Sequence, residues 1–218
     1  MRISDYLKDR KYPGRILIGG TLKNGRPVAA YALMGRSEMS RNRVLVMDNQ
    51  ELRAVPYDCD SDCGNELTLY IASYESGDRK ILANGSHGKD IKDALDSGKT
   101  LLESLDGLSP EPDALNTPRI TLVYERDGRY SLLIVRKNAK GEDEKVVWNY
   151  ENTPGFGHII HTYSEDASAF SSDPVCVSFG DSLSSFTEEL WNSLDEDNKV
   201  SLYVGYEGAE RIINKRVW

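Results

Sequence analysis

Three arginines, an asparagine and two serines lie within the nine residues Gly35–Arg43 of this 218-residue chain. Arginine offers a planar fork of donors that fits a phosphate or a carboxylate, and serine and asparagine add neutral donors. The segment follows the apolar run Val28–Met34 and precedes Val44–Met47, so it is predicted to be a loop between two strands. Ordinary surface turns favour glycine, asparagine, aspartate and proline. The density of arginine therefore predicts an anion site, with a solvated basic turn as the alternative.

Other polar turns offer partners for this segment, because functional residues tend to lie on loops that a rigid scaffold positions. These turns are Pro13-Gly14-Arg15, Asn84–His87, Asn116–Arg119 and Thr153–His158. Together with the arginine segment they supply guanidinium groups, amides, hydroxyls, glycine N–H groups and a histidine. This inventory suits a ligand that carries a phosphate, a sugar and a polar heterocycle.

The sequence lacks several motifs that carry well-known chemistries. It contains no Walker-type phosphate loop, no Gly-x-Gly-x-x-Gly after a strand, no Gly-x-Ser-x-Gly and no His-Glu-x-x-His. Readings as an ATPase, a dinucleotide oxidoreductase, a serine esterase or a zinc protease therefore lose their usual support. Cys59 and Cys63 could contribute to a metal site, but the histidines follow no finger spacing, so reduced thiols in a polar loop are expected. No metal and no organic cofactor is expected.

The charge balance limits the class of partner. A formal net charge of −8 argues against binding to a nucleic-acid duplex, which is carried largely by basic surface. An arginine cluster in an acidic chain points instead to a small anionic ligand. The beginning of the chain has no apolar signal region, and no apolar run approaches the length of a membrane span, so a cytoplasmic protein is expected.

Most of the chain shows the signals of strands. Apolar runs between turn residues predict strands at Arg15–Gly20, Pro27–Met34, Val44–Asp48, Glu51–Val55, Leu67–Ala72, Lys80–Ala83, Ile120–Tyr124, Tyr130–Val135, Val146–Tyr150, His158–Tyr163, Val175–Phe179, Val200–Tyr206 and Arg211–Asn214. Asn24-Gly25, Asn49-Gln50 and Asp127-Gly128 predict tight hairpin turns. Ser164–Pro174 is predicted to be a long loop.

Two segments have helical spacing. Ile91, Ala94 and Leu95 begin an i, i+3, i+4 pattern that continues in the leucines after Gly98, which predicts a helix broken or kinked near that glycine. Ser185-Phe-Thr-Glu188 reads as a capping box at the start of a second helix. Strands and helices do not alternate, so we expect an α+β protein, residues 1–218 forming a single domain, in which helices cover one or two mainly antiparallel sheets.

Several motifs, in order along nearly the whole chain, resemble the archaeal-type IMP cyclohydrolase family. They are Tyr12-Pro13-Gly14-Arg15, Ala30-Tyr31 with Gly35–Ser37 and Ser40–Arg43, Asn84–His87, Asn116–Ile120, and Tyr150-Glu151 with Gly155–His158. The resemblance implies a four-layer α-β-β-α sandwich like that of the N-terminal-nucleophile hydrolases, with two mainly antiparallel sheets. It also implies that the protein closes the ring of the purine nucleotide FAICAR to give IMP, the last step of purine synthesis. The chain begins Met1-Arg2, so the terminal nucleophile of those hydrolases is not expected.

Ring closure requires a carboxamide nitrogen to attack a formamide carbon, a donor to polarise the formyl oxygen and a group that moves the proton. The catalytic candidates are Arg36, Tyr70, Asp113 and Glu111. The candidates for substrate binding are Arg15, Arg41, Asn42, Arg43, Asn84, Ser86, Asn116, Thr117, Arg119 and His158. Each has a plainer alternative: Tyr70 as a core aromatic, the two acids as loop carboxylates, and His158 as a structural histidine.

Two other classes of function stay open. An amide hydrolase on the same fold would need a nucleophile, for which Cys59, Cys63 and Ser86 are the candidates. A nucleotide-binding module without catalysis would use the arginine segment to sense a purine monophosphate. A homo-oligomer is also open, since exposed sheet edges can pair between subunits.

Overall fold

The structure is a computed structural model that describes residues 1–58, 69–164, 173–206 and 208–217. Its helices are α1 (Ile3–Leu7), α2 (Glu38–Arg41), α3 (His87–Asp96), α4 (Leu183–Ser193) and a short 3-10 helix, η1 (Glu103–Leu105). Its strands are β1 (Ile16–Thr21), β2 (Pro27–Met34), β3 (Arg43–Asp48), β4 (Glu51–Pro56), β5 (Tyr70–Ile71), β6 (Ser73–Ser76), β7 (Arg79–Ala83), β8 (Arg119–Tyr124), β9 (Tyr130–Lys137), β10 (Asp143–Tyr150), β11 (Phe156–His161), β12 (Val175–Ser178), β13 (Lys199–Tyr206) and β14 (Ala209–Asn214).

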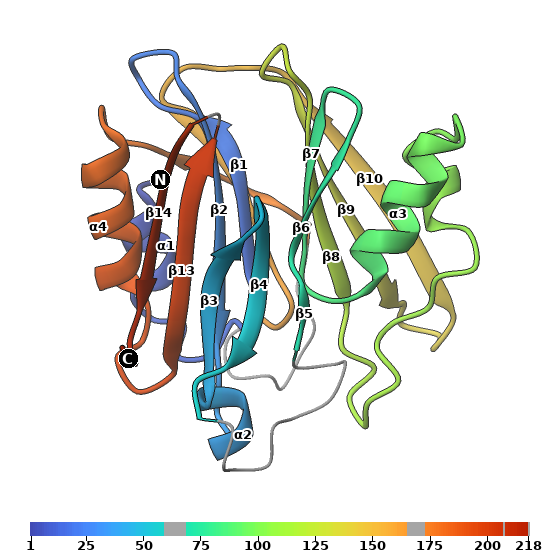
Figure 1. Ribbon diagram of the computed structural model, residues 1–218, viewed down its shortest axis with the longest axis horizontal. Coiled ribbons are helices and arrows are strands. Elements are labelled where there is room, and N and C mark those ends of the chain that lie inside the picture. Colours follow the sequence, from blue (N-terminus) through green and yellow to red (C-terminus); the bar gives the residue numbers. More distant parts are fainter. Residues whose placement is uncertain (59–68, 165–172, 207, 218) are drawn as a thin grey trace.

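The strands form three antiparallel sheets. The largest has the order β12-β11-β1-β2-β13-β14, the second has the order β10-β9-β8-β7-β6, and a small one has the order β3-β4-β5 (Figure 1). Neighbours in sequence usually pair through short turns, and at the β3–β4 hairpin Asn49 and Gln50 both adopt positive φ, of 47° and 68°. The predicted α+β class is confirmed.

The two large sheets face each other across one hydrophobic layer. Alternate residues of β2, among them Ala29, Tyr31 and Leu33, point into this layer, as do Leu122 and Leu132 of the second sheet. The opposite face of β2 supplies Ala30 and Ala32 to a different cluster, as period-two alternation requires. One face of β2 is therefore buried against the second large sheet, and the other is buried in the cluster that includes α1 and α4.

Helices cover the outer faces of the large sheets. Residues of α1 and α4, such as Leu7 and Phe186, pack on the largest sheet, whereas Ile91 and Leu95 of α3 pack on the second (Figure 1). The apolar spacing of α3 places these two side chains on one stripe. Among the described residues, no helix has the length and apolar character needed to cross a membrane.

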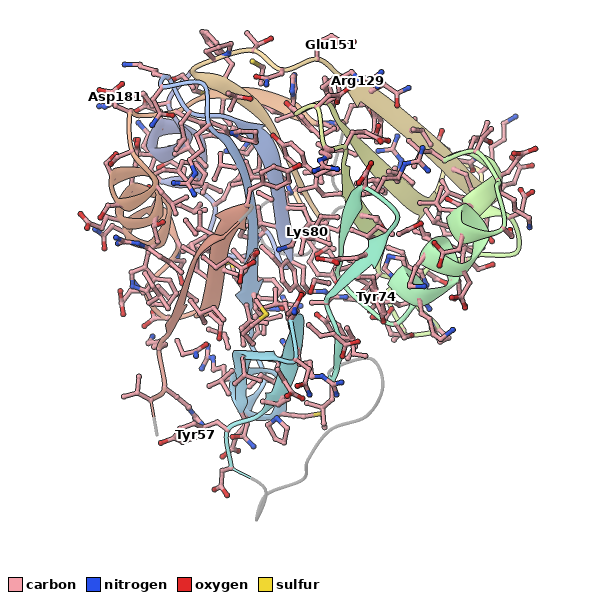
Figure 2. All side chains as sticks on the ribbon, turned by 45° about the horizontal axis from the view of Figure 1, so that its top comes forward. Tyr57, Tyr74, Lys80, Arg129, Glu151 and Asp181 are labelled. Atoms are coloured by element: carbon pink, nitrogen blue, oxygen red, sulfur yellow. The ribbon has the colours of Figure 1, made fainter. Side chains whose placement is uncertain are left out.

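The small sheet and a cross-sheet ion pair join the large sheets. Asn214, at the end of β14, exchanges two hydrogen bonds of 3.0 Å with the backbone of Leu45 in β3. On the other side, Ala72 donates to Leu52 of β4 at 2.6 Å. Lys80 of β7 lies between the sheets (Figure 2) and donates to Tyr203 Oη and to Glu210, each at 2.8 Å.

Several sequence predictions need correction. The helix α3 ends at Asp96, before Gly98 at φ +86°, so the predicted break near that glycine is confirmed, but the segment after it forms only the 3-10 turn η1 and does not continue as an α-helix. The capping box was also misplaced: Ser182 caps α4, and its Oγ accepts from Ser185 N at 3.1 Å. The loop Gly35–Arg43 contains the helical turn α2, which Ser37 caps.

Two further elements were not predicted. Two predicted elements lie partly outside the described residues, so they can be compared with the structure only in part. The helix α1 is only five residues long, and three of the four residues of β6 are serine or glutamate, so neither gives a clear periodicity. The predicted strand Leu67–Ala72 is described only from residue 69, and of Ser164–Pro174 residues 165–172 lie outside the described part of the chain.

The capping assignment predicts a difference between two neighbouring serines. Ser182→Ala should lower the free energy of unfolding by about 1 kcal/mol, because it leaves a helix N–H group without its acceptor. Ser185→Ala should cost less, because Ser185 contributes only its backbone N–H to that bond. Urea unfolding of both variants measures this, and a larger loss for Ser185→Ala would contradict the assignment.

Candidate functional site

A buried ion pair joins two of the predicted site residues. Arg15 lies directly before β1, and its Nη2 donates to Glu111 Oε1 at 2.5 Å. The side chains are 11% and 3% exposed. Asn84, at the end of β7, donates from Nδ2 to the same oxygen at 3.3 Å, and its Oδ1 accepts from Ile120 N at 2.7 Å. Three predicted residues from separate segments thus converge on one carboxylate.

The electrostatics of this pair suit proton transfer. Burial raises the pKa of Glu111 above its ordinary value, although the facing guanidinium of Arg15 acts in the opposite direction. Burial alone would lower the pKa of Arg15, but the charge of Glu111 raises it, so Arg15 remains a cation. Arg15 Nε is buried and has no hydrogen-bond partner among the described residues. A buried donor of this kind is unusual and is available to a ligand.

Two tyrosine hydroxyls meet beside the ion pair. Tyr31 of β2 and Tyr70 of β5 are buried in the layer between the sheets, and their Oη atoms share a hydrogen bond. Burial and the neighbouring Tyr70 raise the pKa of Tyr31 well above its ordinary value, while Arg15 and Arg43 oppose the shift. Tyr31 is therefore a neutral phenol. Tyr31 belongs to the motif Ala30-Tyr31 but was not among the predicted site residues. The sequence signal that could have identified it is the alternation along β2, which places Tyr31 on the face between the sheets.

A chain of contacts leads from the loop before β8 to the surface. Asp113 accepts from Thr117 N at 2.9 Å and from Thr117 Oγ1 at 2.6 Å, and that hydroxyl shares a 2.5 Å bond with Tyr163. Tyr163 stacks on Tyr12 with ring centroids 5.9 Å apart, and the guanidinium of Arg36 lies 4.5 Å from the Tyr12 ring. These contacts give Asp113 the loop-forming role that sequence analysis kept as its alternative.

A second buried cluster lies at the start of α3. Arg119 Nη1 donates to His87 Nδ1 at 3.3 Å, so the other ring nitrogen, Nε2, donates to Thr121 Oγ1 at 3.0 Å. Burial lowers the pKa of His87 to about 3, and Arg119 adds to the shift. His87 is thus a neutral imidazole that orients Arg119 beside the Glu111 loop.

Most hydrogen-bond donors of the arginine segment Gly35–Arg43 bond to other groups of the protein. Arg41 donates to Gly35 O at 3.0 Å and to Asn198 Oδ1 at 3.1 Å. Arg43 donates from Nε to Ser40 O at 2.8 Å. Asn42 is buried and exchanges hydrogen bonds with the backbone of Asp58 at 2.8 and 3.0 Å, while Arg36 is exposed. The three arginines do not converge on one point.

Of the predicted binding residues, His158 lies apart from the ion pair, and two others are exposed. His158 is aligned with Gly19, four residues beyond Arg15, so it lies about 13 Å away along the sheet at about 3.3 Å per residue. There it bonds to Tyr130 Oη at 2.8 Å and stacks on Tyr150. The other two, Ser86 and Asn116, have exposed side chains on loops next to the site.

Neither of the two cysteines that were named as candidate nucleophiles lies in the described part of the chain. Cys59 and Cys63 lie outside the described residues, and Cys176 on β12 is a free, exposed thiol. In the part of the chain that the structure describes, no three His, Cys, Asp or Glu side chains are grouped as metal ligands would be.

Comparison with known proteins gives one consistent result. A family model described as IMP cyclohydrolase-like protein matches residues 12–211. The IMP cyclohydrolase of Methanococcus maripaludis strain C7 is 33% identical over 124 residues, which is 55% of this chain and 61% of the relative. That of Methanocaldococcus jannaschii is 30% identical over 155 residues, or 70% of this chain and 73% of the relative. That of Halobacterium salinarum is 32% identical over 142 residues, or 62% and 72%.

The buried His87 predicts a loss of stability in acid. It is neutral in the fold, whereas the unfolded chain takes up a proton below about pH 6.5, so stability falls as the pH drops from 6.5 towards 3. At pH 5 this loss amounts to about 2 kcal/mol. Urea unfolding at pH 7 and pH 5 should show a correspondingly smaller loss for His87→Gln. Lys89→Gln, on the same helix, should behave as the wild type; an unchanged loss in His87→Gln would contradict the prediction.

Proposed function

The chain belongs to the IMP cyclohydrolase-like protein family, and from this membership we propose that it closes FAICAR to IMP with loss of water. The matches with two M. maripaludis enzymes extend over about three fifths of the length of those relatives, so the activity of the whole protein is part of the proposal. The observation that carries it is the buried Arg15–Glu111 pair, with Asn84 on the same carboxylate oxygen. The ligand is a small purine nucleotide.

We assign the proton transfers to Glu111. The carboxamide nitrogen of FAICAR forms a bond to the formyl carbon and loses one proton, and the oxyanion that forms takes up one proton to become a hydroxyl. The former formamide nitrogen then loses its proton as the ring C=N bond forms, and the hydroxyl takes up a second proton and leaves as water. A carboxylate that accepts each nitrogen proton in turn and passes it to the oxygen accounts for both steps. The raised pKa of Glu111 favours this exchange, because it brings the acid closer to neutral pH than an exposed glutamate.

The formyl oxygen needs donors as negative charge develops on it. The unpartnered Nε of Arg15 and the hydroxyl pair Tyr31–Tyr70 beside the ion pair are the candidates. The charge of Arg15 acts on both tyrosines, which supports a single compact site. One such donor contributes on the order of 3 kcal/mol to the stabilisation of a transition state.

The remaining predicted residues fit binding roles around this centre. Arg36 and Arg119 would offer cations at the surface end of the site, and Ser86, Asn116 and Thr117 would offer polar groups from the adjoining loops. We assign Arg41, Asn42 and Arg43 to holding the loop after β2 rather than to the reacting atoms. His158 is assigned a structural role, because it bonds to Tyr130 in the layer between the sheets.

The layer order supports a finer description of the fold. Helices α1 and α4, the two large sheets and α3 follow one another, as in the four-layer sandwich of the N-terminal-nucleophile-hydrolase type. We propose that residues 1–218 form a single domain of this kind, in which the ring-closing site lies at one end of the layer between the sheets.

The activity can be tested directly with Glu111→Gln. Purified protein in EDTA is given FAICAR, and IMP formation is followed by absorbance. The wild type should turn over, and the variant should lose at least about 100-fold in kcat, because glutamine cannot carry the proton. Glu103→Gln, which changes a glutamate on the nearby turn η1, should keep kcat within about twofold. A wild type without turnover, or an active and folded Glu111→Gln, would contradict the proposal.

A second test separates Tyr70 from an ordinary buried tyrosine. Tyr70→Phe should lower kcat roughly 100-fold, which corresponds to one lost donor to the developing oxyanion. Tyr130→Phe is the matched control, because Tyr130 is also buried between the sheets but bonds to His158. If the two variants have equal kcat values, Tyr70 does not take part in the reaction.

A further inference from the structure

A hollow of about 650 Å³ lies at the ends of β13 and β14, beside the start of β3. Five cationic side chains line it, together with one acid and one valine: Arg41, Arg43, Lys199, Lys215, Arg216, Asp197 and Val200. Such a concentration of positive charge is unexpected in a chain with a formal net charge of −8. The volume is within the usual range for small-molecule pockets.

Neutral groups help to orient several of these cations. Arg43 is 4% exposed and donates to the carbonyl of Ser40. Lys199 is 7% exposed, and its Nζ lies 4.5 Å from the Trp191 ring centre. Arg216 donates to Asn42 Oδ1 at 3.3 Å. With five cations and one acid, Asp197, in its lining, the hollow carries a net positive charge.

One exposed acid reaches these cations from the surface. Glu196 is 74% exposed, and its carboxylate lies 2.6 Å from Lys199 Nζ and 3.6 Å from Lys215 Nζ. The hydrogen bond from Lys199 lowers the pKa of Glu196, so this side chain is an anion. Because Glu196 itself is exposed, its carboxylate can return to water when another anion takes its place beside Lys199.

We propose that this hollow is a second anion site, separate from the Arg15–Glu111 site, which binds a phosphorylated small molecule whose phosphoryl group displaces Glu196. Guanidinium and ammonium groups together form the usual protein environment of a phosphoryl group. Arg41 and Arg43 then serve this hollow. Lys215 and Arg216 lie beyond residues 12–211, the part that matches the family model, so the site is not a feature of the matched region alone.

Calorimetric titration with pyrophosphate tests the site without a need for turnover. The wild type should bind a single pyrophosphate per chain at low ionic strength. Lys215→Gln/Arg216→Gln should raise the dissociation constant at least about tenfold, because two charge-assisted hydrogen bonds are lost. Glu196→Gln should lower the dissociation constant by about threefold or more, because the side chain that competes with pyrophosphate loses its charge. The matched control Lys99→Gln/Lys140→Gln removes two exposed charges elsewhere and should bind as the wild type.

The outcomes separate this inference from the proposed activity. If Lys215→Gln/Arg216→Gln binds pyrophosphate as tightly as the wild type, or if Glu196→Gln does not bind it more tightly, the second site is overturned. FAICAR kinetics should be unchanged in both variants. A roughly tenfold rise in KM at constant kcat in Lys215→Gln/Arg216→Gln would make the hollow the phosphate subsite of the substrate and so also overturn a separate site. Failure of FAICAR turnover in the wild type bears only on the proposed activity.

Discussion

The burial of Arg15 against Glu111 is the constraint on which the site depends. Two charges removed from water are tolerated only when their geometry is good and further hydrogen bonds satisfy them. Here the conditions are met from three segments: the residue before β1, the loop before β8 and Asn84 after β7. The loop itself is held by Thr117, whose backbone carbonyl accepts from Glu111 N at 2.9 Å. Loss of one partner would leave a buried, unpaired charge, so the loops around the pair have little freedom.

The arrangement of the sheets explains why the tyrosine pair stands beside these charges. Period-two alternation sends Tyr31 of β2 into the layer between the large sheets, and the small sheet brings Tyr70 to it from β5. The small sheet is itself fixed to β14 through Asn214 and to the second sheet through Ala72. The buried tyrosine pair is tolerated in this layer because each hydroxyl has a partner. The same packing therefore holds the charged and the phenolic groups together.

The sequence predicts the strands of this fold well, because apolar alternation and turns such as Asp127-Gly128 are local signals. It predicts helix ends poorly. Serine is a favoured capping residue at both position 182 and position 185, and only the observed backbone shows that Ser182 is the cap. For the site, the candidates Arg15, Asn84 and Glu111 come together as a set. The composition of the arginine segment does not reveal that Gly35 O and Asn198 accept hydrogen bonds from the guanidinium of Arg41, because these partners depend on the fold.

The central claim is that Arg15 and Glu111 act as one unit, and a double-mutant cycle on FAICAR turnover measures this most directly. Arg15→Gln, Glu111→Gln and the double variant are compared with the wild type by kcat/KM, with folding checked by circular dichroism. If the two residues form a unit, the double variant loses little more activity than Glu111→Gln alone. If the two losses multiply, each residue acts independently, and the ion pair is not the basis of the site.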